Sequence, residues 1–186
     1  MTALPKHKLT STEFIDWAQS QPTGRFELVR GDVIAMAPER ARHVIVKLNI
    51  ARALQDAVRR AGLPCIVFTG GMSVVINSDT TYEPDASAQC GASVNLDATI
   101  IERPMIVVEV TSPSSAADDT GGKLADYFTL ASVQHVLVVD PSRKIAMQHS
   151  RSAGAEIITR ILREPDELSF EPPGFTTKVS AFYDGL

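Results

Sequence analysis

The run Met105-Ile106-Val107-Val108-Glu109-Val110-Thr111-Ser112-Pro113-Ser114-Ser115 holds one carboxylate inside an otherwise apolar, β-branched segment. Its first half is typical of a strand buried on both faces in the centre of a helix-covered sheet, and Pro113 ends it. An unpaired buried charge is unfavourable, so Glu109 must be ion-paired, bound to a metal, or placed where the strand opens to water. Each alternative predicts a position at the carboxyl edge of the strand, where open α/β sheets bind ligands.

The composition is that of an ordinary globular protein. The chain has 186 residues, 44% of them hydrophobic and 22% charged, which predicts a single domain over residues 1–186. The net charge is −4, whereas a constitutive nucleic-acid binder usually has a basic surface. An acidic net charge does not exclude a local basic groove. No segment reads as a membrane span or a signal peptide. Cys65 and Cys90 fit no zinc spacing and read as reduced core residues, so we expect a cytoplasmic protein without membrane contacts.

The periodicity predicts a mixed α/β protein, an α+β arrangement in which helices flank a central mixed sheet. A capping-box pattern at Thr10 and Glu13 starts a first helix, and a hairpin turns through Arg30-Gly31. The hairpin places Phe26 and Leu28 on one face and Glu27 on the other.

The expected helices are residues 10–20, 42–61 and 118–130. The apolar stripe of the second is expected to comprise Val44, Ile45, Leu48, Ala51, Leu54 and Val58. The expected strands are residues 25–29, 32–37, 65–68, 72–76, 82–88, 105–111, 133–139, 144–149 and 156–162, the last two as edge strands. Residues 95–103 are expected to be a loop, and the tail around Pro172, Pro173 and Gly174 to have little regular structure.

Four side chains become candidates for a functional site once they are placed on these elements. Asp85 follows Pro84 on a strand, Glu109 ends the central strand, Lys123 lies near the start of the next helix, and Glu27 is in the hairpin. If the strands of Asp85 and Glu109 are neighbours, the two acids can share one metal with a backbone carbonyl such as that of Val110. This all-oxygen set suits Mg²⁺ or Mn²⁺, and Lys123 would stabilise the charge that develops on a phosphodiester. Glu27 would orient a water or help to hold a second ion.

Each of these residues also has an ordinary structural explanation. An aspartate after a proline is common in turns, a lysine on a helix is usually solvated, and a glutamate in a hairpin is usually a surface charge. His43 could face the pocket, but a lone histidine on an amphipathic helix is more often structural. Gly121-Gly122-Lys123 is no P-loop, because Ala117 and Leu124 occupy positions that need a glycine and a hydroxyl.

Four stretches occur in the order and rough spacing of the Uma-two family of restriction-endonuclease-like proteins, within the PD-(D/E)XK nuclease superfamily. They are residues 26–31, 82–85, 108–115 and 123–127, and the resemblance extends from about Leu9 to about Phe182. It implies a restriction-endonuclease-like core and Mg²⁺-dependent phosphodiester hydrolysis, with Asp85 and Glu109 as metal ligands. The superfamily lysine usually lies two residues after the second acid, where this chain has Thr111. In the resembling family that role falls on the following helix, which matches Lys123, and Glu27 matches an early acidic residue.

Two classes of function follow. The first is a metal-dependent endonuclease that acts on DNA, with Asp85, Glu109, Lys123 and Glu27 as the catalytic set. The second is a non-catalytic nucleic-acid-binding or regulatory dimer on the same fold, which the acidic balance favours. A metal hydrolase that acts on a small phosphoester is a third hypothesis. A homodimer is expected in the first two, because the apolar edge strand around Ile157-Ile158 could pair across a two-fold axis.

Overall fold

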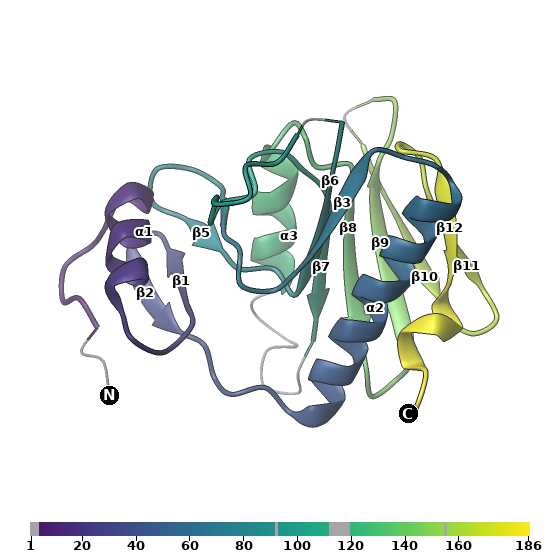
Figure 1. Ribbon diagram of the computed structural model, residues 1–186, viewed down its shortest axis with the longest axis horizontal. Helices are drawn as coiled ribbons and strands as arrows, with labels where there is room; N and C mark the ends of the chain where they lie inside the picture. Colours follow the sequence, from purple (N-terminus) through teal and green to yellow (C-terminus); the bar gives the residue numbers. More distant parts are fainter. Residues whose placement is uncertain (1–3, 92, 112–119, 155) are drawn as a thin grey trace.

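The protein is built around a mixed six-stranded sheet with the strand order β10-β9-β8-β7-β6-β3 (Figure 1). The computed structural model describes residues 4–91, 93–111, 120–154 and 156–186. The strands of this sheet are β3 (Cys65–Thr69), β6 (Ala86–Cys90), β7 (Pro104–Val110), β8 (His135–Asp140), β9 (Ile145–Arg151) and β10 (Ile157–Leu162). β7 and β8 are parallel, whereas the other neighbouring pairs are antiparallel. The predicted mixed sheet is therefore confirmed, with the apolar segment before Thr111 as one of its interior strands.

Two smaller sheets and four helical segments complete the described part of the fold. A four-stranded sheet has the order β2-β1-β5-β4, and β11 pairs with β12. Their bounds are β1 (Phe26–Val29), β2 (Asp32–Ala35), β4 (Val74–Val75), β5 (Thr81–Tyr82), β11 (Glu167–Phe170) and β12 (Phe175–Lys178). The helices are α1 (Ser11–Ser20), α2 (Ala41–Arg60), α3 (Thr120–Thr129) and the 3-10 helix η1 (Val179–Tyr183).

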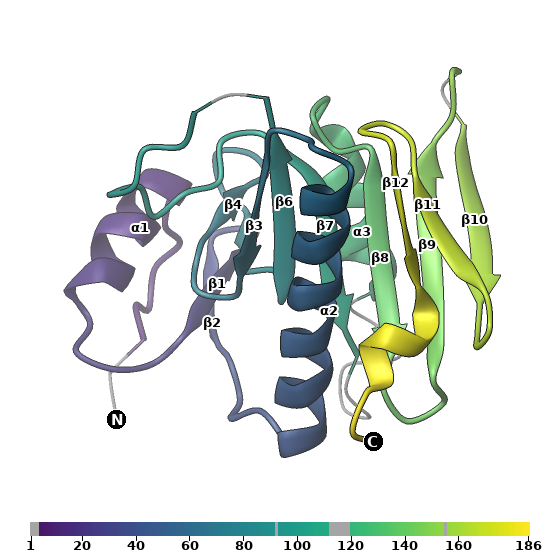
Figure 2. The same cartoon turned by 45° about the vertical axis from the view of Figure 1, so that its right-hand side comes forward.

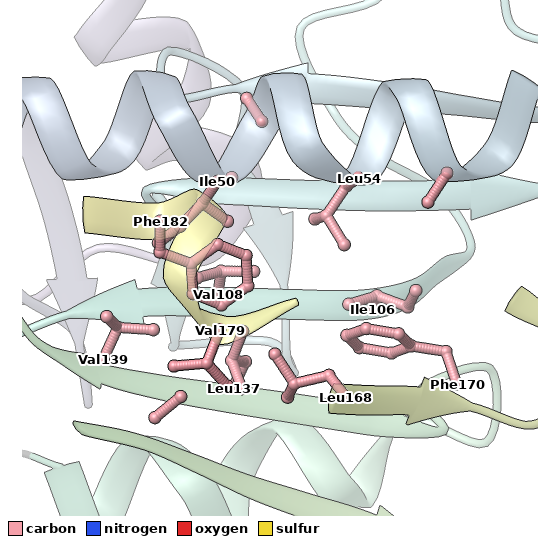
Figure 3. Close-up of a cluster of buried hydrophobic side chains, with 14 of the residues drawn as sticks. Ile50, Leu54, Ile106, Val108, Leu137, Val139, Leu168, Phe170, Val179 and Phe182 are labelled. Atoms are coloured by element: carbon pink, nitrogen blue, oxygen red, sulfur yellow. The ribbon is translucent and has the colours of Figure 1, made fainter. Parts of the chain in front are cut away.

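The two faces of the central sheet are covered by different helices (Figure 2). Ile106 and Val108 of β7 pack with Ile50 and Leu54 of α2, together with the C-terminal hairpin and η1, as Figure 3 shows. Val107 packs on the other face with Tyr127 of α3. Because side chains alternate along a strand, the same alternation turns Glu109 toward α3.

Several local predictions are confirmed. Thr10 caps α1 through a complete capping box with Glu13. Arg30 and Gly31 both have positive φ angles, 50° and 84°, as a two-residue turn matched to the strand twist requires. Leu28 packs against α1 in a separate apolar cluster, so the opposite face of β1 carries Glu27 toward the central sheet.

The segment from Tyr82 to Ala88 is not one strand, contrary to the prediction. β5 ends at Tyr82 in the four-stranded sheet, and β6 begins at Ala86 in the central sheet. Pro84 lies at the change of sheet, because proline cannot donate the backbone hydrogen bond that a continuous strand needs. Asp85 is therefore the last residue before a central strand, not a residue within one.

The prediction of the apolar stripe of α2 was wrong for the first half of the helix. Val44, Ile45 and Leu48 are exposed, whereas Val46 and Ile50 are fully buried. Two overlapping series in this helix satisfy a spacing of three to four residues, so periodicity alone does not choose between them. Ala51, Leu54 and Val58 belong to the buried face, as predicted.

The C-terminal third is more regular than the sequence indicated. The tail forms the β11–β12 hairpin and η1, which pack on the α2 side of the sheet. Only β10 of the predicted pair of edge strands lies at an edge, since β9 pairs with β8 on its other side. The predicted helix start at Asp118-Asp119 lies outside the described residues, and α3 is described from Thr120.

The prediction of reduced cysteines was also wrong. Cys65 of β3 and Cys90 of β6 are paired directly across neighbouring antiparallel strands and joined in a disulfide. The 25 residues between them hid this proximity, because strand pairing is not visible in the spacing of two isolated cysteines.

Candidate active site

A cleft of about 620 Å³ opens between α2, the first hairpin and the end of the central sheet. It is lined by all four predicted catalytic residues, Glu27, Asp85, Glu109 and Lys123, and by Val110, the predicted carbonyl ligand. Its walls also include Arg40 and Arg42 at the start of α2. Residues from distant parts of the sequence therefore meet in one cavity.

Asp85 lies at the end of β6 nearest to the end of β7. Ala86 pairs with Val108, so Asp85 and Glu109 occupy corresponding places on neighbouring strands. The backbone N–H of Val110 donates to Asp85 Oδ2 over 2.7 Å, and the backbone N–H of Asp85 donates to the carbonyl of Val108 over 3.0 Å. These bonds fix the carboxylate next to the backbone of Val110, the predicted carbonyl ligand.

The other oxygen of Asp85 faces α2. His43 Nε2 lies 3.0 Å and Lys47 Nζ 3.5 Å from Asp85 Oδ1. One helical turn separates the two, so both project from the same face of α2. Burial alone would raise the pKa of Asp85, but the hydrogen bond and charge of His43, the N–H of Val110 and the charge of Lys47 hold that pKa below its usual value.

Glu109 is held by residues of α3. Tyr127 Oη donates to Glu109 Oε1 over 2.6 Å, and Lys123 Nζ lies 3.7 Å from the same oxygen. Burial raises the pKa of Glu109 to about 8; the charge of Lys123 acts against this, whereas those of Asp85 and Glu27 add to it. The pKa of Tyr127 is raised as well, by burial and by the neighbouring carboxylate.

Glu27 is a buried partner of Lys123. Its Oε1 accepts from Lys123 Nζ over 2.8 Å and from the backbone N–H of Glu83 over 3.0 Å. Lys123 is itself buried and lies 5.0 Å from the centroid of the Tyr82 ring. The hairpin acid therefore contacts the helix lysine rather than lying on the surface.

A second ion-pair network was missed by sequence reasoning. Glu39 accepts from Lys47 Nζ over 2.7 Å and from Arg25, which also pairs with Glu83 over 2.7 Å. A local signal for the cleft face of α2 was present, since His43 and Lys47 are four residues apart on one helix. Lys123 and Tyr127 carry the same signal on α3.

The residues present fit a divalent cation. The carboxylates of Asp85 and Glu109 are hard oxygen donors, and each already lies against a lysine ammonium group. In the described part of the chain, one group of three or more His, Cys, Asp or Glu side chains converges closely enough to share an ion. Its members, Glu39, His43 and Asp85, place their ligand atoms within 4.8 Å of one another, and Glu109 is not part of that group.

Two acids at adjoining strand ends, with a lysine on the next helix, lie in the cleft of a mixed α/β protein. The family model for Uma2, described as "Putative restriction endonuclease", matches residues 11–180. The chain belongs to this family.

A solved structure and two sequence relatives match this chain over most of its length. The crystal structure of a putative nuclease of the DUF820 group from Anabaena variabilis superimposes with a TM-score of 0.72 and 14% sequence identity. The match covers 94% of this chain and 97% of that one. An uncharacterized protein of Synechocystis sp. is 28% identical over 184 residues, which is 98% of this chain and 95% of the relative. A second from that organism is 23% identical over 167 residues, 87% and 92% of the two chains.

None of the described helices is long and apolar enough to cross a membrane.

Proposed function

We propose that this protein is a metal-dependent endonuclease that hydrolyses phosphodiester bonds of DNA, and that residues 1–186 form one restriction-endonuclease-like domain. The observation that carries this proposal is the meeting of Asp85 and Glu109 at neighbouring strand ends, with Lys123 3.7 Å from Glu109 Oε1. Membership of a family described as "Putative restriction endonuclease" supports it.

Asp85, Glu109 and the carbonyl of Val110 would hold Mg²⁺ or Mn²⁺. When bound, the ion lowers the pKa of a water and neutralises charge on the phosphate. In the reaction the water gives up a proton to solvent as its oxygen forms a bond to phosphorus. The bond from phosphorus to the leaving sugar oxygen breaks, and that oxygen takes up a proton from solvent.

The other site residues position charge for this reaction. Lys123 reaches the cleft next to Glu109 and would donate to the attacking water or to a phosphoryl oxygen as its negative charge grows. Glu27 fixes the ammonium group of Lys123, and Tyr127 fixes the carboxylate of Glu109. Each buried contact restricts the side chain that it holds before the substrate binds.

DNA is favoured over a small phosphoester because of the cations at the mouth of the cleft. Arg40 and Arg42 both line the cavity and are exposed, and exposed arginines at this place suit the phosphates on either side of a scissile bond. A chain of net charge −4 thus carries a local basic edge where the substrate would enter.

The test is cleavage of duplex, single-stranded and small phosphoester substrates with Mg²⁺ or Mn²⁺. We expect the parent to cut DNA and Glu109→Gln to lose the activity. Glu167→Gln, a matched change at an exposed acid on β11, should retain it. Metal binding without cleavage of any nucleic acid would favour the non-catalytic dimer instead, and cleavage that survives Glu109→Gln would contradict the site.

A homodimer is proposed through β10, whose outer edge has no strand partner among the described residues. Ile158 and Ile161 of this strand are exposed, and exposed apolar edge strands pair readily with copies of themselves. Light scattering should give a dimer for the parent and a monomer for Ile158→Lys. A monomeric parent would contradict the dimer, and loss of a dimer in Leu48→Lys but not in Ile158→Lys would place the interface on α2.

A cytoplasmic location fits access to DNA, but the Cys65–Cys90 disulfide is unusual in a reducing compartment. Rapid alkylation of free thiols in intact cells would show whether Cys65 and Cys90 are reduced or joined in the cell. Modification of both cysteines would support the cytoplasm, whereas protection of both would contradict it.

A further inference from the structure

We propose that His43 is a direct ligand of the metal ion, binding it through Nε2 beside Asp85, and that this nitrogen makes the site prefer Mn²⁺ to Mg²⁺. The inference rests on the proposed metal site and adds a residue and a metal preference that the two carboxylates alone do not give.

The placement of His43 is that of a ligand. Its Nε2 lies 3.0 Å from Asp85 Oδ1, and both side chains line the cleft. Two ligand atoms that each lie about 2.1 Å from one ion at right angles are about 3 Å apart. The observed separation therefore allows both atoms to bind the same ion with little movement of either side chain. The ion would replace the hydrogen bond between them, and His43 would bind as a neutral imidazole with its proton on Nδ1.

The backbone of His43 is held firmly by the core. It lies in the first turn of α2, a helix of 20 residues. The next turns bury Val46 and Ile50 completely against the central sheet. A ligand on a packed helix keeps its position when an ion binds, which favours binding because little ordering is needed.

A further acid and a lysine lie beside His43 and Asp85. Glu39 adds a third ligand atom to those of His43 and Asp85, all within 4.8 Å. Its Oε1 already accepts from Lys47 and Arg25, which makes Glu39 a weaker candidate for a ligand than His43. Lys47 Nζ lies 3.5 Å from Asp85 Oδ1. The ammonium group of Lys47 therefore balances part of the negative charge that a bound metal ion would otherwise balance.

The nitrogen changes which metal the site takes. Mg²⁺ prefers oxygen ligands in near-ideal octahedral geometry and keeps several waters, whereas imidazole suits transition ions. A site of Asp85, Glu109 and the carbonyl of Val110 would accept either ion. The addition of His43 Nε2 favours Mn²⁺.

The experiment is pulsed electron paramagnetic resonance of Mn²⁺ bound to the intact protein, which detects a nitrogen bonded directly to the ion. We expect a nitrogen signal in the parent and its loss in both His43→Ala and His43→Gln. The matched control is Lys47→Met, one turn further along the same helix face, which should keep the nitrogen signal. Circular dichroism checks that each variant is folded.

Calorimetry supplies the metal preference. The parent should bind Mn²⁺ at least about 10-fold more tightly than Mg²⁺, and His43→Gln should reduce that ratio about 10-fold, the usual scale for loss of a group that supports a metal site. Bound Mn²⁺ without a nitrogen signal, or a signal that persists in His43→Ala, would overturn the inference and leave the proposed nuclease intact. A nitrogen signal in a protein that cuts no DNA would instead overturn the proposed nuclease and leave the inference standing.

Discussion

Tyr127 donates from Oη to Glu109 Oε1 over 2.6 Å, in the middle of the apolar contact between α3 and the central sheet. The bond ties the acid of β7 to α3. Tyr127→Phe keeps the ring and removes the donor, so a buried carboxyl group loses its partner. We expect a loss of about 1–3 kcal/mol in the free energy of unfolding, measured by denaturant titration.

The matched control for that change is Tyr183→Phe. Tyr183 is also buried, but its hydroxyl reaches the carbonyl of Asp140 at 3.5 Å, a long contact. Its loss should cost less than about 1 kcal/mol. Equal losses of unfolding free energy in the two variants would show that the hydrogen bond to Glu109 stabilises the fold no more than the long contact of Tyr183 does.

Glu27 is expected to act through Lys123. Glu27→Gln weakens the 2.8 Å ion pair that fixes the lysine, and changes of such supporting partners typically cost about 10- to 100-fold in activity. DNA cleavage should fall on this scale while the affinity for Mn²⁺ in calorimetry stays within about two-fold of the parent. A marked fall in Mn²⁺ affinity or stoichiometry would show that Glu27 helps to hold an ion instead.

Stability at mildly acidic pH should depend on His135. Its ring is buried, Nε2–H donates to the carbonyl of Pro172 over 2.7 Å, and Nδ1 accepts from Ser150 over 2.9 Å. Burial lowers the pKa of His135 from 6.5, against the opposing effects of Pro172 and Glu171. The unfolded chain therefore binds the proton first, and stability is lost as the pH falls through about 6.5 toward the lower pKa of the folded state.

The measurement is the free energy of unfolding of the parent and of His135→Gln between neutral and mildly acidic pH. The parent should lose up to about 1.4 kcal/mol more per pH unit than the variant below pH 6.5. His7→Gln, a change at an exposed histidine, should retain the parental slope. Parallel curves for the parent and His135→Gln would exclude the buried neutral ring as the cause.

Arg40 and Arg42 are expected to contact DNA phosphates. The double change to Gln should weaken DNA binding regardless of sequence and flatten the dependence of log affinity on log salt by about 0.9 per lost contact. The control is Arg59→Gln with Arg60→Gln, which removes two exposed arginines at the opposite end of the same helix. If the control flattens the salt dependence as much, DNA does not enter at the cleft.

The site acids could be found in the sequence because their signals are local. Glu109 is a charge inside an apolar strand, Asp85 follows a proline, and Lys123 is on the next helix. The contacts made by α2 are different, because His43 reaches Asp85 across 42 residues and only the packing of the helix on the sheet brings them together. Two apolar series in α2 satisfied the helical period, so periodicity alone did not identify the buried face. The spacing of His43 and Lys47 was the one local signal for the face that meets the cleft.

The same limit explains the disulfide and the tail. Cys65 and Cys90 become neighbours through the register of β3 and β6, and register depends on contacts that the spacing of two cysteines does not encode. The β11–β12 hairpin has only four residues in each strand. Strands this short contain too few residues for an alternation of apolar and polar side chains to be recognised. Pro172, Pro173 and Gly174, which lie between the two strands, obscure the pattern further.

The central claim is a metal site formed by the two strand-end acids, and calorimetric titration of Mn²⁺ tests it without knowledge of the substrate. The proteins to compare are the parent, Asp85→Asn, Glu109→Gln and the exposed control Glu167→Gln, each checked for folding by circular dichroism. We predict that the parent and the control bind Mn²⁺ and that both site variants bind it at least about 10-fold more weakly. Equal Mn²⁺ binding by all four proteins would contradict the account.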